Sequence, residues 1–260
     1  MSDRILDVKN LTIRFGGLTA NDNVNVHIDK GEFIGLIGPN GAGKTTFFNS
    51  ITGNLIPTEG DVLFKGESLV GKKPNQISHL GVSRTFQNIR IFPKMTVLEN
   101  VCLPMHSQPT YGIVPAIFGL PSAKKKDKEI QEEALGYLDR LGILKYKDSE
   151  AGALAYGLQR RLEIARALAA KPTLLLLDEP AAGMNNDECN ELADLLRGIH
   201  KEFNLTTMLI EHHIDFVLGL CDRIYVLNLG SLLAEGKPEE IQANPDVIKA
   251  YLGARRTKNE

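Results

Sequence analysis

Gly38-Pro-Asn-Gly-Ala-Gly-Lys-Thr-Thr46 is a glycine-rich stretch with the spacing G-x-x-x-x-G-K-T. The apolar run before it, residues 32–37, predicts a buried strand, and residues 46–51 predict the first turns of a helix. Glycines let backbone N–H groups curl around an anion, and the N-terminus of a helix adds partial positive charge. This context favours a loop that binds the phosphates of a nucleoside triphosphate over an ordinary strand-to-helix turn.

The polar groups of this loop suit a nucleotide and its metal ion. Lys44 can reach the outer phosphates, and the Thr45 hydroxyl can hold Mg²⁺. The residues expected to contact the nucleotide are Asn40, Gly41, Ala42, Gly43, Lys44, Thr45 and Thr46.

Composition describes an ordinary globular chain. Its 260 residues, 43% of them hydrophobic and 24% charged, can form one large domain or two small ones. The net charge of −2 leaves no basic footprint, so we expect no nucleic-acid partner. The three cysteines, Cys102, Cys189 and Cys221, are far apart, which predicts neither a disulfide framework nor a zinc site and fits a reducing cytoplasm.

Nothing in the sequence predicts secretion or a membrane span. The N-terminus lacks the apolar region of a secretion signal. No stretch approaches the roughly 18–20 apolar residues that a spanning helix needs. The most apolar loop, residues 111–121, is too short and is interrupted by proline and glycine.

Hydrophobic periodicity predicts an α/β fold. Residues 4–35 alternate apolar and polar positions, which is typical of antiparallel strands. Later in the chain strands alternate with helices, beginning with the fully apolar strand 173–178, and this predicts a doubly wound parallel sheet. A further strand is expected over residues 81–87, ending at Gln87.

The stretch from about residue 88 to 160 has a mostly helical pattern. Its predicted helices begin after a Thr96 cap with Glu99 in the first turn, at Ser122 and at Gly157. We therefore expect a helical subdomain at about 88–160, inserted into an α/β core formed by residues 1–87 and 161–253.

A pair of carboxylates follows the apolar strand at residue 178. Asp178 leaves the strand end beside the phosphate loop, where it can orient Mg²⁺ through a water. Glu179 can then polarise the attacking water as a general base. The alternative role for such a pair is to cap a helix, and the nearby phosphate loop favours the catalytic role.

Leu154-Ala-Tyr-Gly-Leu158 stands about 20 residues before Asp178. With the phosphate loop and the carboxylate pair, it gives the chain a resemblance to ATP-binding-cassette (ABC) ATPases, whose signature is Leu-Ser-Gly-Gly-Gln. Ala155 lacks the hydroxyl that the family's serine extends across a dimer to the γ-phosphate, and Leu158 lacks the family's amide. Gly157 remains, at a helix N-terminus whose N–H groups and dipole can bind an anion.

The resemblance assigns roles to further residues. It implies that Phe15 stacks on adenine, although a core strand phenylalanine is the alternative. It implies that Gln87 contacts Mg²⁺ and water and links to a transmembrane partner, although a surface polar residue is the alternative. It implies that His212 contacts the γ-phosphate and steadies Glu179, with the adjacent His213 as the other possible register.

The resemblance covers about residues 5–253 and implies a P-loop ABC-ATPase fold with an antiparallel β subdomain and an inserted α-helical subdomain. It further implies ATP and Mg²⁺ as cofactors, and a second ATPase as partner, either an identical copy or a sister subunit. Transmembrane permease subunits are the other implied partners, which places the chain at the cytoplasmic face of the inner or plasma membrane.

Several segments resemble the ATPases of branched-chain amino-acid importers, among them Thr85-Phe-Gln-Asn-Ile-Arg90 and Asn244-Pro-Asp-Val-Ile-Lys-Ala-Tyr-Leu-Gly253. The insert near residues 105–121 resembles the larger of that importer's two ATPases. The apolar residues of 89–93 then suit either a docking patch for the membrane partner or subdomain core. Alternative functions are a related lipid or lipopolysaccharide exporter ATPase, a non-transport ABC protein of DNA repair or translation, and a weakly hydrolysing regulator.

Overall fold

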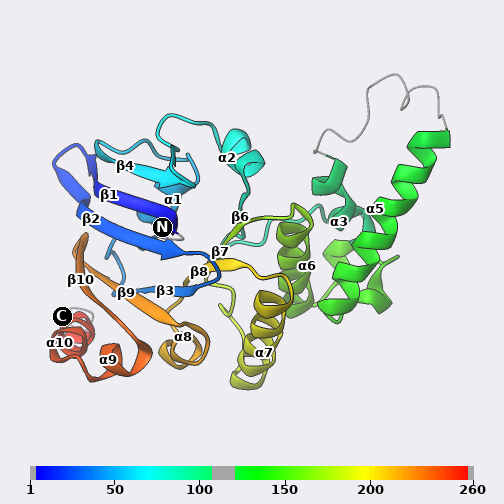
Figure 1. Ribbon diagram of the computed structural model, residues 1–260. Coiled ribbons are helices and arrows are strands. Elements are labelled where there is room, and N and C mark those ends of the chain that lie inside the picture. Colours follow the sequence, from blue (N-terminus) through cyan, green and yellow to red (C-terminus); the bar gives the residue numbers. More distant parts are fainter. Residues whose placement is uncertain (1–3, 107–120, 257–260) are drawn as a thin grey trace. The chain divides into compact units, whose positions relative to one another are not determined.

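The protein, seen in a computed structural model, is described over residues 4–106 and 121–256 (Figure 1). Its chain forms two compact units: a core unit, Met1–Arg84 with Thr173–Glu260, and a helical unit, Thr85–Pro172. The sequence-based division near residue 160 would cut a helix that lies wholly within the helical unit and packs on the other helices there.

The described strands of the core unit form two sheets (Figure 1). The first sheet is antiparallel, with strand order β2-β1-β4-β5. Its strands are β1 Arg4–Phe15, β2 Leu18–Asp29, β4 Glu59–Phe64 and β5 Glu67–Ser68. The alternating apolar pattern of the N-terminal segment correctly predicted the antiparallel pairing of β1 with β2, because one face of these strands is buried and the other is not.

The second sheet has the order β10-β9-β3-β8-β7-β6 and is parallel except for β10, which pairs antiparallel with β9 at one edge. Its strands are β3 Phe33–Ile37, β6 Val82–Arg84, β7 Leu174–Asp178, β8 Thr206–Ile210, β9 Arg223–Asn228 and β10 Ser231–Gly236. Every residue of β3, β7 and β8 is buried, as expected for parallel strands covered on both faces. The predicted parallel sheet is therefore confirmed.

The predicted strand 81–87 is shorter than expected, because β6 ends at Arg84 and Gln87 lies in a bend. The backbone beyond Arg84 has other partners. Arg160 donates to the carbonyls of Phe86 and Gln87, at 2.6 and 2.8 Å, so this segment belongs to the helical unit and no longer to the sheet.

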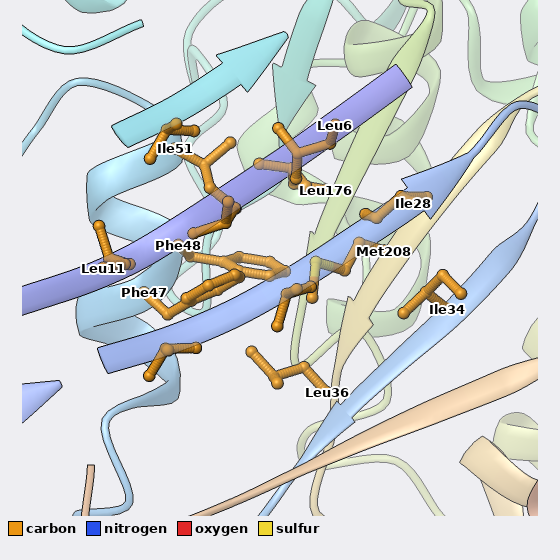
Figure 2. Packing of buried hydrophobic residues seen from close by; sticks show 14 of the residues in the cluster. Leu6, Leu11, Ile28, Ile34, Leu36, Phe47, Phe48, Ile51, Leu176 and Met208 are labelled. Carbon is orange, nitrogen blue, oxygen red and sulfur yellow. The ribbon is translucent and has the colours of Figure 1, made fainter. Parts of the chain in front are cut away.

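Helix α1, Lys44–Ile51, follows β3 and joins both sheets in one hydrophobic cluster. Figure 2 shows Phe47 and Phe48 among Leu6 and Leu11 of β1 and Leu36 of β3. Both phenylalanine side chains are fully buried, and such burial contributes roughly 1.5–3 kcal/mol each. The start of α1 is therefore held on a rigid support.

The helical unit contains α3 Val97–His106, α5 Pro121–Arg140 and α6 Tyr156–Ala169, with short 3₁₀ turns at Leu144–Tyr146 and Ala151–Ala153. The predicted Thr96 cap is confirmed, since the Glu99 N–H donates to Thr96 Oγ1 and the Thr96 N–H donates back to Glu99. The helix predicted from Ser122 is confirmed as α5, and its residues Ile130, Ala134 and Leu138 are buried. Most of the apolar loop at 111–121 and of the insert near 105–121 lies outside the described residues, which end at 106 and resume at 121.

The remaining described helices belong to the core unit. They are α2 Pro74–Leu80, α7 Asn186–Glu202, α8 Ile214–Leu220, α9 Pro238–Ala243 and α10 Pro245–Arg256. Among the helices that the structure describes, none combines the length and the apolar character needed to cross a membrane.

Candidate nucleotide-binding site

Three neighbouring parallel strands carry most of the candidate residues at their carboxyl ends. β3 leads into the phosphate loop after Ile37, β7 ends at Asp178, and β8 ends at Ile210. Because β3 pairs in parallel with β8 and β8 with β7, all three carboxyl ends lie on the same side of the sheet. Open α/β sheets bind ligands beside the carboxyl ends of their strands.

The glycines of the phosphate loop are required by its close contacts. Gly38 and Gly43 have φ angles of 152° and 98°. A Cβ atom would lie 2.1 Å from the Leu227 carbonyl oxygen at Gly38, and 2.4 Å from the Ala20 carbonyl oxygen at Gly43. A side chain at either position would force backbone apart, so the loop conformation depends on these two glycines.

Where the phosphate loop meets α1, its solvent-facing side is open to an anion. Gly43 is the N-cap of α1 and offers no side chain to the first N–H groups of the helix. Asn40, Gly41 and Thr45 are exposed, Thr46 is half-buried and Ala42 is buried. At Gly41 no described atom lies within 4 Å of a Cβ position, so there is room beside this part of the loop.

Lys44 lies inside the loop that it follows. Its Nζ donates to the carbonyl oxygens of Gly38 and Pro39, at 2.7 and 3.1 Å, and its side chain is buried. Burial lowers the pKa of the Lys44 ammonium, and the carboxylates of Glu179 and Asp178 act against this shift. A buried cation so close to two carboxylates belongs to the same electrostatic cluster as the end of β7.

Asp178 is held by a buried ion pair that the sequence did not reveal. Arg84 Nη2 donates to Asp178 Oδ2 at 2.6 Å, while Arg84 Nη1 donates to Asn49 Oδ1 of α1 at 2.7 Å and approaches Thr52 Oγ1 at 3.3 Å. One guanidinium thus ties the end of β7 to the helix that follows the phosphate loop. Arg84 looked like an ordinary strand residue, because its partners come from two distant segments.

Glu179 and His212 are brought together as expected. His212 Nε2 lies 2.9 Å from Glu179 Oε1, and since a carboxylate only accepts, Nε2 carries the proton in this contact. His213 instead places Nδ1 at 3.4 Å from Glu211 Oε2. The structure therefore places His212, the register favoured from the sequence, against Glu179.

Phe15 ends β1 with 47% of its surface exposed, so it is not a core residue. Its ring is accessible for stacking on a planar ligand. Asn185, in the loop after β7, caps α7 by accepting the Glu188 N–H at 3.0 Å.

The remaining candidates lie in the helical unit. Gln87 is exposed, and its carbonyl accepts from the fully buried Arg160. Ala155 is the exposed N-cap of α6, and Gly157 lies in the first turn of that helix. The side chain of Arg160 also donates to Glu163 Oε2 at 2.7 Å, so α6 holds the segment that contains Gln87.

Residues 21–182, more than half of the chain, match the family described as ABC transporter. The chain belongs to this family. Residues 231–257 of this ABC cassette also match the family described as branched-chain amino acid ATP-binding cassette transporter. The predicted P-loop α/β fold is confirmed, and the predicted ATP hydrolysis is the activity of the family.

The cassette is similar to named proteins along nearly its whole length. It is 47% identical over 253 residues to the high-affinity branched-chain amino acid transport ATP-binding protein LivG of Escherichia coli K12, covering 97% of this chain and 99% of the relative. It superposes with a TM-score of 0.83 and 33% identity on an ATP-binding cassette of an ABC transporter solved in its ADP conformation, over 96% of this chain and 99% of the other. A dimeric ATP-binding cassette bound to ADP and phosphate gives a TM-score of 0.75 at 27% identity, over 90% and 98%.

Proposed function

We propose that this cassette is the ATP-hydrolysing subunit of a membrane importer for branched-chain amino acids. The observation that carries the proposal is the 47% identity to LivG across 97% of the chain. The match of residues 231–257 to the branched-chain cassette family adds support from a segment that lies outside the general ABC match.

In the proposed reaction Lys44 and the loop N–H groups bind the phosphates of ATP, and Phe15 stacks on adenine. Glu179 accepts a proton from the attacking water, and His212 holds the Glu179 carboxylate and contacts the γ-phosphate. Their 2.9 Å contact at the sheet edge supports this division of roles, because one side chain orients the other.

The residues proposed for Mg²⁺ are Thr45, Asp178 and Gln87. Oxygen donors of this kind suit Mg²⁺, which takes the rest of its ligands from phosphates and water. Thr45 is exposed at the start of α1. Among the described residues no cluster of three His, Cys, Asp or Glu side chains could hold a metal ion alone, and a magnesium ion shared with the nucleotide fits this donor set. When bound, the ion would neutralise the phosphates.

A second cassette completes the site in this proposal, either an identical copy or a sister subunit. Gly157 has no described atom within 4 Å of a Cβ position and does not have a positive φ, so packing within the chain does not require glycine there. A glycine on an accessible helix start suits close approach to a phosphate held by another subunit. The dimeric relative with ADP and phosphate supports pairing of this kind.

The membrane partner is proposed to be a pair of permease subunits, with the cassette peripheral at the cytoplasmic face. Phe92 is 49% exposed and Pro93 is exposed, which favours the docking patch over subdomain core for residues 89–93. No role for nucleic acid is proposed.

The test is turnover and transport by matched variants. Glu179→Gln should bind ATP normally and lose at least about a hundredfold in hydrolysis, the scale of a lost general base. Lys44→Ala should lose ATP binding together with hydrolysis. Co-purified membrane subunits reconstituted with wild-type chain should take up leucine, isoleucine or valine with ATP. Near-normal hydrolysis by Glu179→Gln would overturn the catalytic roles, and export of lipid without amino-acid uptake would overturn the transport assignment.

A further inference from the structure

We propose that Glu211 is a positioning residue that holds Glu179 and His212 in their hydrolytic arrangement. Glu211 follows β8 directly and its side chain is 1% exposed, so a carboxylate is buried at the sheet edge beside the candidate site. The inference rests on the catalytic roles proposed for Glu179 and His212.

The two carboxylate oxygens of Glu211 bind two different loops. Oε1 accepts the N–H of Ala181, in the loop after β7, at 2.8 Å. Oε2 accepts the N–H of His212 at 2.8 Å and the N–H of His213 at 3.3 Å, in the loop after β8. One side chain therefore joins the loop that carries Glu179 to the loop that carries His212.

The loop after β7 needs such support because Glu179 has an unfavourable backbone conformation. Its φ angle is +47°, in the left-handed region that a residue with a side chain rarely adopts. The Glu179 N–H donates to the Ile210 carbonyl at 2.9 Å, and the Glu179 carbonyl accepts the Ala182 N–H at 3.2 Å. The Ala181 N–H donates to Glu211, which is the side-chain contact that ties this turn to the loop after β8. Losing the contact with Glu211 would let the turn relax and move the Glu179 carboxylate away from His212 Nε2.

The chemistry of the contacts explains why a carboxylate is needed. All the backbone partners of Glu211 are N–H donors, one set at each oxygen. A glutamine has one acceptor oxygen and one NH₂ donor, so it would turn a donor toward either Ala181 or His212. An aspartate is one methylene shorter and would not span both loops. Glu211→Gln and Glu211→Asp therefore each break one anchor while changing little volume.

The decisive experiment measures steady-state ATP hydrolysis and ATP affinity of the purified cassette in the pairing that hydrolyses ATP, either with itself or with its sister subunit. Both Glu211 variants should lose roughly ten- to a hundredfold in kcat, because small misplacements of catalytic groups have effects of this size. KM and the Kd for ATP should stay within about twofold, since the phosphate loop is untouched. A role confined to stability would lower the melting temperature and leave the kcat of the folded protein unchanged.

A double-mutant cycle with His212→Ala separates positioning from an independent effect. If Glu211 acts through the Glu179–His212 pair, Glu211→Gln should have little further effect on kcat in the His212→Ala background. Glu240→Gln is the matched control, because Glu240 also accepts a backbone N–H, from Lys237 at 2.8 Å, where an amide oxygen serves equally. It should retain wild-type kcat.

Wild-type kcat in both folded Glu211 variants, or fully multiplicative losses in the cycle, would overturn the proposal. This failure is distinguishable from failure of the proposed function. If the proposed function failed, Glu179→Gln itself would hydrolyse ATP normally. If only the role of Glu211 failed, Glu179→Gln would be inactive and the Glu211 variants would be active.

Discussion

Arg84 and Asp178 form an ion pair whose side chains are only 6% and 4% exposed, with 2.6 Å between Nη2 and Oδ2. The guanidinium also bonds to Asn49 on α1, so it connects the phosphate-loop helix to the strand that presents Asp178. The candidate Mg²⁺ carboxylate is thus positioned from behind by a residue on the edge strand β6.

Arg84→Met should destabilise the protein by about 3–5 kcal/mol, because it removes the guanidinium from a buried carboxylate. Urea unfolding followed by circular dichroism measures this loss. Arg14→Met is the control: Arg14 pairs with Glu59 on the surface, and an exposed pair contributes at most about 1 kcal/mol. Equal losses in the two variants would contradict the structural role given to Arg84.

The hydrogen bonds that Glu163 accepts from residues 86–90 give a second prediction. Glu163 Oε1 accepts the N–H groups of Phe86 and Arg90, at 3.2 and 3.1 Å. Burial raises the pKa of Glu163 although Arg160 opposes this shift, so the carboxylate is held at an energetic cost. Glu163→Ala should speed hydrogen exchange at the Phe86 and Arg90 amides by at least about tenfold.

Glu133→Ala is the control for that exchange experiment. Glu133 pairs with Lys171 at an exposed position of the same unit and receives no N–H from residues 86–90. Its removal should leave those amides unchanged. Unaltered exchange in Glu163→Ala would show that the Gln87 segment is ordered by other contacts.

The order of strands and helices could largely be predicted from local sequence, whereas the exact ends of some elements could not. The strand predicted at 173–178 is observed as β7, Leu174–Asp178, because a short, fully apolar run in a chain of alternating strands and helices favours a buried parallel strand. The end of β6 was not predictable, because it depends on Arg160, more than 70 residues later. Helices α2 and α9 were missed, since seven and six residues are too few to show helical periodicity.

The candidate site divides in the same way. The phosphate loop and the Asp178–Glu179 pair were predictable because spacing and strand ends are visible in the sequence. The register of the preceding strand favoured His212 over His213, and the contact of His212 with Glu179 agrees with this choice, while His213 contacts Glu211. Glu211 is visible in the sequence directly after an apolar strand. Its role could not be predicted, because its partners belong to two loops that meet only in the folded sheet.

ATP should promote association of the Glu179→Gln variant with itself or with a sister cassette. Without hydrolysis the proposed closed dimer persists, and light scattering should show a mass increase on adding ATP and Mg²⁺. Gly157→Glu in the same background should bind ATP but stay monomeric, because the new carboxylate would face the γ-phosphate across the dimer. A Cβ atom at Gly157 would meet no described atom within 4 Å, so a side chain can begin there without displacing the chain's own packing. If Glu179→Gln stays monomeric with ATP, both by itself and with a sister cassette, the proposed dimer closure is contradicted.

His200 predicts an acid-dependent loss of stability. It lies on α7, with Nε2 at 3.1 Å from the Gly31 carbonyl and Nδ1 at 3.1 Å from Thr207 Oγ1. Burial lowers the pKa of His200 below its usual 6.5, although the Gly31 carbonyl and Asp222 oppose the shift. The unfolded chain therefore takes up the proton first on acidification.

The contribution of His200 to the free energy of unfolding should consequently be fully present above pH 6.5 and should fall as the pH drops through the unfolded pKa of His200. His200→Gln removes this titration and retains a side-chain N–H for the Gly31 carbonyl, so its free energy of unfolding should fall less steeply between pH 7.5 and 5. Urea unfolding of both proteins across that range measures the difference, in which the other histidines cancel. Parallel curves would show that His200 does not titrate differently on unfolding, and a steeper fall in the variant would reverse the sign of the pKa shift.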